Sequence, residues 1–583
     1  MPNAPTSTAV TNAAASILKT TKFGAHLLRG RLWIESLIAL ALGMALMRMV
    51  YGDGKDLSNK VTGVPGNDSF FHIKMAAMIP EGGLLDELPW LRFSWFRREG
   101  DAYVSNHYGF HVLLCPFVYA SHALRDDYLA GGRWAMAVCM GLSLVLLNLL
   151  LLERGVPWRV YWLIVFVLLP FQFFVRHAYV RAIAPSLVVM LLLILLMFRR
   201  RYAWAGLTVL AFTHLYNGGL IYGPVLVILF VAASLIGSRE ERKGLWRLIV
   251  CTLGGWALGI LIHPYRAGLF EFMRMQVFGT GLTPDISVGT EWRPYDNVWW
   301  FAQMSGVLLT VWAVALCLRL RLGPRLQAPD LMLTLANFFF LALTFKARRF
   351  IEYWPVFCLL SAACLSSAPI AQFKIRLTNV FQRNQWRRFV AATAYVFAVP
   401  VILLIVFGLV RFSTLWMLIR KDARCKYDLP AIRSAMDFLK EHSERGDVVF
   451  ADDWDIFPVY FFFNDHNHYV AGLDPKFTHE RRPDWWERFV KITRGLAPTE
   501  VIVNVPVDGS TASGGFEKKS IHVALEDIRD IFGARYAISD ADHKALAGKL
   551  AAAPNLAELV YPCTQYSECR DAPYVIFRIR TPA

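Results

Sequence analysis

The feature that most constrains this chain of 583 residues is a series of apolar stretches, each of about 16 to 23 residues, separated by short basic clusters. A stretch of this length crosses the hydrocarbon layer of a membrane as a helix. The mean hydropathy of +0.39 agrees, and it excludes both a soluble cytosolic enzyme and a disordered chain. The sequence therefore predicts a polytopic α-helical membrane protein. Eleven spans are expected, at 32–50, 133–152, 158–175, 183–198, 203–217, 218–236, 247–263, 298–318, 330–345, 351–371 and 389–411.

The placement of the positive charges predicts the orientation. Lys and Arg number 61 against 45 Asp and Glu, a surplus of +16. Many of the basic residues lie in connections that fall on one side if the chain alternates, at 153–159, 199–202, 238–247, 319–329 and 372–388. Because positively charged loops stay in the cytoplasm, the amino terminus is expected there, with the first span as an uncleaved anchor. The surplus thus reflects membrane topology, and nucleic acid is not expected as a partner.

One apolar stretch, 109–124, does not fit as a crossing, because it is short and would move every later basic cluster outside. We expect it to lie in the outer interface as a horizontal or re-entrant helix. Residues 51–132 would then form one long outer loop of a transmembrane domain covering 1–411. Residues 412–583 would lie outside as well. We place the chain in the bacterial inner membrane with residues 412–583 in the periplasm. An endoplasmic-reticulum or archaeal membrane is the alternative.

The carboxyl-terminal region has a different composition. Strand-like runs alternate in it with helical patterns, at 447–451, 468–473, 500–505, 534–539 and 574–579. This alternation predicts an extracytoplasmic α/β domain. Cys563 and Cys569 lie in it with five residues between them, so a disulfide is expected in an oxidising compartment.

Polar residues with chemical potential collect in the first outer loop. Asp68 and His72 are four residues apart, as are His107 and His111, so each pair would share one face of a helix. Such a face can hold a hard divalent cation or supply a general base. The alternative is a solvated loop with interfacial aromatic residues.

Two basic clusters fall at outer helix ends, where the topology rule disfavours positive charge. They consist of Arg176, His177 and Arg181, and of Lys346, Arg348, Arg349 and Glu352. A lipid phosphate would explain them, because arginine offers a planar fork of donors. The alternatives are snorkelling to lipid headgroups and internal ion pairing.

Two further acidic motifs lie on the outer side. Glu291 stands beside a membrane entry, where it can bind a metal, orient an acceptor or pair with an arginine. A second motif follows the strand 447–451 and contains Asp452, Asp453, Trp454 and Asp455. Carboxylates and an aromatic ring at a strand end suit recognition of a polar ligand, although a capped turn uses the same residues. His214 and His263 are expected to be packing histidines.

In their order, these motifs resemble the catalytic subunit of oligosaccharyltransferase and, more broadly, the GT-C superfamily of membrane glycosyltransferases. Asp68 in GNDSFFHIKMA is similar to the acidic residue of that family's first outer loop. SVGTEWRPYDNVWW is similar to the motif of the fifth outer loop, with Ser287, Val288 and Glu291 and one extra residue before the glutamate. KARRFIEYWP resembles the membrane arginine motif through Arg348 or Arg349.

The soluble domain contains a further match to the family's motifs. The chain also departs from these motifs at two places. Trp454 and Asp455 match the family's Trp-Trp-Asp motif, in which Asp453 replaces the first tryptophan. RAIAPS stands where the family has its second acidic motif, so one metal-ligand carboxylate is missing. His72 or His177 would replace it if a metal binds, and imidazole would favour a softer metal than magnesium.

The resemblance implies transfer of a sugar or oligosaccharide from a polyprenyl-phosphate or polyprenyl-pyrophosphate donor to a protein, lipid or glycan acceptor, next to membrane lipids. Asp68, Glu291 and His72 are the expected catalytic residues. A Mg or Mn ion would be held by Asp68, Glu291 and His177. The substrates would meet the residues Arg176, His177, Arg181, Arg348, Arg349, Glu352, His107, His111, Trp454 and Asp455.

Three alternatives stay open at this point. One is a metal-free monosaccharide transferase that uses a polyprenyl-phosphate sugar and needs Asp68 and an arginine, but not Glu291 as a ligand. Another is a lipid or solute transporter, which would carry charged or broken centres in its membrane helices. The third is a non-catalytic scaffold whose tail binds a partner.

Overall fold

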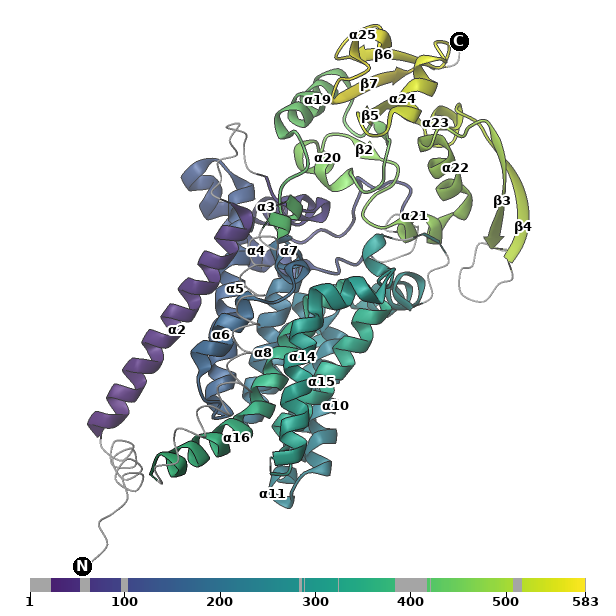
Figure 1. Cartoon of the computed structure of the whole chain (residues 1–583). Coiled ribbons are helices and arrows are strands. Elements are labelled where there is room, and N and C mark those ends of the chain that lie inside the picture. Colours follow the sequence, from purple (N-terminus) through teal and green to yellow (C-terminus); the bar gives the residue numbers. More distant parts are fainter. Residues whose placement is uncertain are drawn as a thin grey trace, which may run out of the picture.

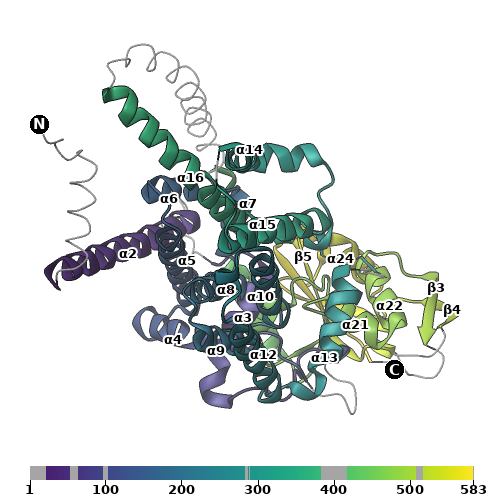
Figure 2. The same ribbon diagram turned by 90° about the horizontal axis from the view of Figure 1, so that it is seen from below.

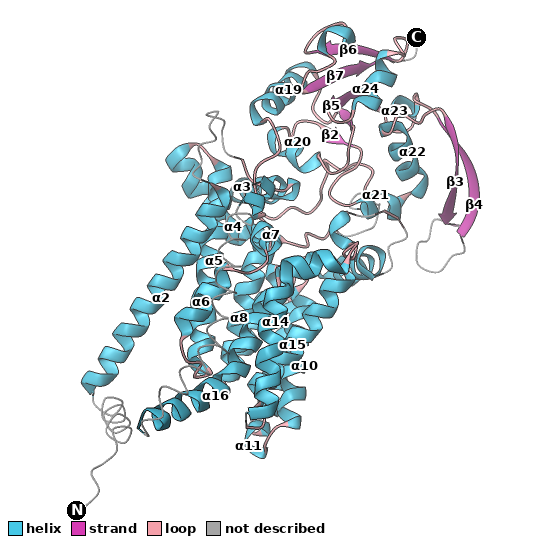
Figure 3. Cartoon of the chain, in the orientation of Figure 1, coloured by secondary structure: helices cyan, strands magenta, loops and turns pink. Residues whose placement is uncertain are grey.

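The computed structural model describes residues 22–52, 63–95, 103–282, 286–287, 289–322, 324–382, 417–419, 421–506 and 516–581. These residues form a bundle of helices and, at one end of it, a mixed α/β domain (Figure 1). The described strands belong to this second part, as the colouring by secondary structure shows (Figure 3). The last predicted span, 389–411, and the predicted boundary between the two domains lie outside the described residues.

Long apolar helices build the bundle. They are α2 (Lys22–Tyr51), α5 (Tyr128–Glu153), α8 (Ile183–Phe198), α9 (Tyr202–Leu215), α10 (Gly219–Ile236), α12 (Leu245–Leu261), α14 (Val298–Leu322), α15 (Ala328–Lys346) and α16 (Trp354–Gln382), with the short α11 (Arg239–Arg242) before α12. Seen from below, α5, α8 and α10 lie within the bundle, and α2 runs along its edge against α5 (Figure 2).

The outer surface of the bundle is apolar. Ile34 and Ile38 of α2 are about 60% exposed, as are Trp246 and Val250 of α12. Such a surface is stable in lipid and not in water, so the chain is an integral membrane protein, as predicted. In the part of the chain that the structure describes, five helices have the length and hydropathy of a membrane span, and a bent helix pair is a sixth candidate. The predicted count of eleven spans is therefore not confirmed.

The predicted span 158–175 is wrong as a single helix. It is broken into α6 (Arg159–Val167) and α7 (Phe171–Ala178), which meet at 77°. The break lies at Pro170, which has no N–H to donate and restricts the residue before it. As a result, α7 turns toward the end of the bundle and carries Arg176 with it.

Two helices between α2 and α5 cap the bundle under the α/β domain (Figure 1). They are α3 (Asn67–Gly82) and α4 (Tyr108–Arg125), which pack against each other and against α5. The stretch 109–124, expected to lie in the outer interface, is the core of α4.

The α/β domain contains a five-stranded sheet with the order β2-β1-β5-β7-β6, in which β2, β1 and β5 are parallel and β7 is antiparallel to both neighbours. A separate antiparallel hairpin pairs β3 with β4. The strands are β1 (Val448–Ala451), β2 (His468–Tyr469), β3 (Thr499–Pro506), β4 (Phe516–Val523), β5 (Ala534–Asp540), β6 (Ala557–Tyr561) and β7 (Tyr574–Ile579). The helices are α19 (Leu429–His442), α20 (Phe457–Phe463), α21 (Pro475–Arg481), α22 (Pro483–Thr493), α23 (Asp527–Asp530), α24 (Lys544–Ala551) and α25 (Tyr566–Cys569).

All five predicted strand segments form strands, so the prediction of an α/β domain is confirmed. The segments β4 and β6 were not predicted as strands. The expected disulfide joins Cys563 to Cys569.

The α/β domain packs against residues 63–95. Tyr469 N donates to Trp90 O at 2.7 Å, and Trp90 Nε1 donates to Asp465 O at 2.8 Å. Next to these bonds, the ring of Phe70 meets that of Phe462 at 5.5 Å between centroids. One apolar core therefore continues from the bundle into the α/β domain.

Candidate active site

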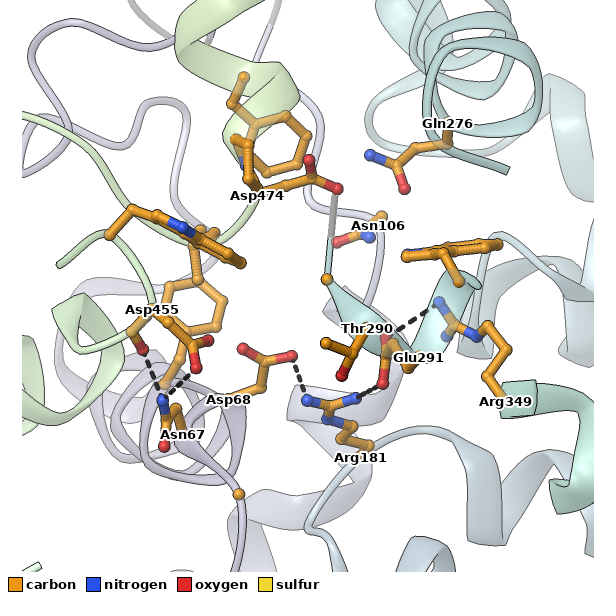
Figure 4. A pocket seen from close by; sticks show the side chains of 18 of the residues that line it. Asn67, Asp68, Asn106, Arg181, Gln276, Thr290, Glu291, Arg349, Asp455 and Asp474 are labelled. Carbon is orange, nitrogen blue, oxygen red and sulfur yellow. Dashed lines mark hydrogen bonds and ion pairs between the residues drawn. The ribbon is translucent and has the colours of Figure 1, made fainter. Parts of the chain in front are cut away.

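A cavity of about 1200 Å³ lies between the α/β domain and the end of the bundle that faces it. One wall comes from α3, α7 and two short helices, η3 (Thr290–Trp292) and η4 (Arg348–Glu352). Part of the opposite side comes from α13 (Arg266–Arg274) and the π-helix η2 (Met275–Leu282). The loops after β1 and β2 of the α/β domain complete the lining. Figure 4 shows that the polar side chains of these elements point toward one another.

Asp68 lies in the first turn of α3, where the positive end of the helix dipole favours a carboxylate. The preceding Gly66 has a φ of 74°, a conformation that a residue with a Cβ rarely adopts. Asp68 Oδ2 accepts from Arg181 Nη2 at 2.8 Å. Arg181 thus engages one carboxylate oxygen and leaves Oδ1 of Asp68 for another partner.

Glu291 is the centre of an ionic cluster. Glu291 forms an ion pair with Arg176. Its Oε2 also lies 3.1 Å from Arg181 Nη1, and its Oε1 lies 3.2 Å from Arg349 Nη1. Burial alone would raise the pKa of Glu291, but the charges of Arg176, Arg349 and Arg181 hold it well below its usual range. The fully buried Glu352 pairs with Arg176 on the other side, with 2.6 Å from Arg176 Nε to Glu352 Oε1.

Aromatic rings fix the arginines of this cluster. The guanidinium of Arg349 lies 4.0 Å from the ring centre of Trp292, and those of Arg176 and Arg181 lie within 5.4 Å of Tyr179. Stacked guanidinium groups keep their edges available for hydrogen bonds, so this wall can receive a phosphate.

The adjacent Arg348 behaves differently from Arg349. It pairs with the exposed Asp296 at 3.3 Å and donates to Pro294 O, and it is not among the residues that line the cavity. Of the two arginines that the motif KARRF offered, the structure thus brings only Arg349 to the cavity.

Two of the predicted histidines line the cavity and two do not. His72 and His107 line the cavity, and His72 Nδ1 lies 2.9 Å from Nε2 of the buried His111 behind it. Burial lowers the pKa values of His72 and His107 well below the usual range, and the nearby positive charges add to this. The two rings are therefore neutral and hydrogen-bonded.

His177 is a correction to the predicted substrate and metal ligands. It follows Arg176 on α7, and adjacent residues of a helix point about 100° apart. Its ring is 1% exposed, its Nδ1 lies 2.8 Å from Phe173 O, and it does not line the cavity. His177 therefore packs inside the bundle, away from Asp68 and Glu291.

Trp454 and Asp455 line the cavity from the loop after β1. Asp455 is held by Asn67, whose Nδ2 donates to Asp455 Oδ2 at 2.7 Å and to its main-chain oxygen at 2.8 Å. Tyr427 OH in turn donates to Asn67 Oδ1 at 2.6 Å. Asn67 directly precedes Asp68, so this contact sets Asp455 beside the ionic cluster (Figure 4).

Several lining residues were not predicted as site residues, among them Asn67, Tyr179, Tyr216, Asp474 and His543. Asn67 and Tyr179 stand next to or near predicted residues in the sequence. Asp474 and His543 follow strands β2 and β5 at the ends where a sheet binds ligands, and this position is the signal that could have found them.

A second carboxylate cluster lies at the same edge of the sheet. Asp452, Asp540 and His543 have ligand atoms within 4.8 Å of one another, and this is the single such group of three among the described residues. His543 Nδ1 already contacts Asp540 Oδ1 at 2.8 Å. Internal ion pairing therefore accounts for these side chains.

The fully buried Asp452 makes stability depend on pH. Burial and the charge of Asp540 raise the pKa of Asp452, so the folded state binds its proton more tightly than the unfolded state does. The contribution of this proton to the free energy of unfolding is complete below a pH of about 4, where Asp452 is protonated in the unfolded state too. It is lost as the pH rises through the raised pKa of the folded state. We expect Asp452→Asn to raise the melting temperature at pH 8 by on the order of 3 °C, and by less at pH 5.

Thermal unfolding of the detergent-solubilised protein between pH 5 and pH 8 measures this effect. Asp542→Asn removes an exposed carboxylate nearby and serves as the control, with a shift that does not vary with pH. A pH-independent gain for Asp452→Asn would contradict the assignment.

The residues do not fit a divalent cation between Asp68 and Glu291. Arg181 already binds an oxygen of each carboxylate, at 2.8 Å and 3.1 Å. A cation bound to the same oxygens would lie close to this guanidinium, and even two unit charges of like sign at 4 Å cost roughly 4 kcal/mol in partly screened surroundings. The predicted third ligand, His177, lies elsewhere.

Solved structures with a similar fold come from two kinds of membrane protein. The archaeal oligosaccharyltransferase AglB from Archaeoglobus fulgidus, in complex with an inhibitory peptide and a dolichol-phosphate, matches with a TM-score of 0.60 and 12% identity, over 94% of this chain and 74% of that one. ArnT from Cupriavidus metallidurans, bound to undecaprenyl phosphate, matches with a TM-score of 0.51 and 12% identity, over 94% and 97%. The chain has the GT-C fold.

Another structure of the Archaeoglobus fulgidus oligosaccharyltransferase, in complex with Zn and sulfate, matches with a TM-score of 0.55 and 13% identity, over 93% of this chain and 88% of that one. No model of a known protein family matches this chain, and no curated protein matches it by sequence. The resemblance to the GT-C superfamily, predicted from the order of the motifs, is confirmed as a likeness of fold.

Proposed function

We propose that this chain is a glycosyltransferase that moves a sugar or oligosaccharide from a polyprenyl-phosphate or polyprenyl-pyrophosphate carrier to a protein, lipid or glycan acceptor. The observation that carries the proposal is the pairing of a free carboxylate edge with three stacked arginines, in one cavity at the end of apolar helices. The carboxylate is Asp68, and the arginines are Arg176, Arg181 and Arg349.

The side chains divide the reaction among themselves. Asp68 accepts the proton of an acceptor hydroxyl as the acceptor oxygen forms a bond to the anomeric carbon. The bond between that carbon and the phosphate oxygen breaks, and its electron pair leaves with the phosphate. The guanidinium groups of the cluster face this developing negative charge, as electrostatic stabilisation of a leaving group requires. Trp454 and Asp455, in the loop after β1, bind the acceptor.

The fold also supports a site for the carrier. The cavity lies where the bundle meets the α/β domain, and the bundle exposes apolar side chains along its length. A polyprenyl chain can thus stay in the bilayer while its phosphate reaches the arginines. We propose that residues 1–411 form the membrane domain, with the cavity on the periplasmic side of a bacterial inner membrane, and that residues 412–583 form the periplasmic domain.

A transfer assay with two adjacent arginines tests this function. Purified protein is incubated with radiolabelled polyprenyl-phosphate and polyprenyl-pyrophosphate sugars and a membrane extract as acceptor. We expect Arg349→Gln to lower transfer by about 10- to 100-fold, because it removes a charged hydrogen bond to the phosphate. Arg348→Gln is the matched control and should keep wild-type transfer, since Arg348 lies outside the cavity.

Two results would contradict the proposal. Equal losses in the two variants would show that the effect is general loss of positive charge. If the intact wild-type protein transfers sugar from no donor of either class, a transporter or a scaffold becomes the better explanation.

A further inference from the structure

The guanidinium of Arg181 lies between the two carboxylates that the GT-C resemblance assigns to a metal. Nη2 contacts Asp68 Oδ2 at 2.8 Å, and Nη1 contacts Glu291 Oε2 at 3.1 Å (Figure 4). We propose that Arg181 takes the place of a divalent cation, so that this site transfers sugar with a fixed guanidinium instead of a bound metal. This inference rests on the proposed function and names the electrophilic group of the same site.

The geometry of the contacts supports this replacement. A cation that joins two carboxylates must bind one oxygen of each, and Arg181 uses both of its terminal nitrogens to do so. The side chain is 16% exposed and lies against Tyr179, with 5.2 Å from the guanidinium carbon to the ring centre. Two ion pairs and the ring of Tyr179 therefore hold the guanidinium of Arg181 in place.

The charges of the cluster are already balanced without a metal. Three carboxylates, Asp68, Glu291 and Glu352, are in contact with three guanidinium groups, those of Arg176, Arg181 and Arg349. An added divalent cation would leave a net positive cluster that competes for the same oxygens. A departing phosphate instead finds a neutral cluster whose arginines can exchange a carboxylate partner for a phosphate oxygen.

The sequence around Arg181 agrees with this arrangement. RAIAPS stands where the resemblance leads one to expect the second acidic motif, and Arg181 is its first residue. Among the described residues, Asp68 and Glu291 belong to no group of three carboxylate or imidazole ligands whose ligand atoms all lie within 4.8 Å of one another. The residue that begins this stretch is therefore the one that bridges Asp68 and Glu291.

Binding of Mn²⁺, followed by electron paramagnetic resonance, tests the proposal without relying on transfer. Wild-type protein and Asp68→Asn should bind the same amount of Mn²⁺, because no ion is held by Asp68 in the wild type. Arg181→Asp should create a third carboxylate and lower the Kd for Mn²⁺ by at least about 10-fold, as an added carboxylate ligand does for hard cations. This gain should disappear when Asp68→Asn is added, which separates it from ions held by Asp452, Asp540 and His543.

Arg348→Asp is the matched control, because it makes the same change of charge outside the cavity and should gain no such site. In the transfer assay, wild-type activity should stay within about 2-fold after treatment with EDTA, whereas an activity that depended on a general base and a metal would fall far more.

Each outcome counts for or against the proposal. A wild-type Mn²⁺ site that depends on Asp68, or activity that EDTA abolishes and Mn²⁺ restores, would overturn it. If the wild type transfers no sugar but Arg181→Asp gains the Asp68-dependent ion, the proposed function fails while the role of Arg181 as the occupant of the cation position stands.

Discussion

Asp68→Asn is expected to lower the turnover of sugar transfer by about 10²- to 10⁴-fold, with a much smaller change in KM, because it removes the general base. Asparagine keeps an oxygen that can accept from Arg181, so the cavity should keep its shape. The measurement is steady-state transfer from a radiolabelled polyprenyl donor, with kcat and KM determined separately.

Two variants sharpen this test. Asp296→Asn removes an exposed carboxylate that pairs with Arg348 on the same side of the bundle, and it should transfer at the wild-type rate. Asp68→Glu retains the carboxylate but displaces it by one methylene group, so we expect a rate between those of wild type and Asp68→Asn. Unchanged turnover in a folded Asp68→Asn protein would remove Asp68 from the mechanism.

Glu352→Gln is expected to lower the free energy of unfolding by about 3 kcal/mol, because it leaves Arg176 short of one counter-charge in a buried place. The glutamate is 2% exposed, so water cannot replace it. Arg176 retains Glu291 as a partner, which keeps the expected loss at the lower end of the range for broken buried pairs. Denaturant or thermal unfolding in detergent measures the change.

A double-mutant cycle shows whether the loss comes from the pair. Adding Arg176→Gln should cost less than the sum of the two single changes, because the second substitution removes the unpaired charge. Glu240→Gln breaks an exposed ion pair with Lys243 and should cost less than about 1 kcal/mol. Additive losses in the cycle would mean that Glu352 and Arg176 stabilise the fold separately.

Membrane topology made most of the site predictable. The basic clusters predicted which helix ends share a side, and the polar residues expected there, Asp68, Glu291, Arg176, Arg181 and Arg349, line one cavity. A second regularity, the strand-like runs after position 440, predicted the α/β domain whose loops close the cavity. These signals are repeated many times along the chain, so single irregular residues do not hide them.

The choice between adjacent residues was not predictable. His177 follows Arg176, and Arg348 precedes Arg349, yet in each pair only one side chain lines the cavity. The direction of each side chain depends on its position around a short helix, α7 or η4. That position depends in turn on the residue at which the helix begins. For α7 it begins after Pro170, at a break that hydropathy does not reveal because the residues on both sides are apolar.

Contacts between distant segments were also beyond the sequence. Asn67 and Asp455 are 388 positions apart, and neither has a pattern that points to the other. Arg181 was predicted as a phosphate ligand, but its bridging of two carboxylates depends on how α3 and η3 approach it.

The continuous core between the bundle and the α/β domain has a consequence for the chain as a folding unit. Phe461 and Phe462 of α20 meet Phe71 and Phe70 of α3, so the seam between the two parts is built like the interior of either part. The α/β domain expressed alone would expose these rings and associate with itself. Chimaeras that exchange this domain between related proteins would have to carry α3 along with it, since the partner of its aromatic face belongs to the membrane half.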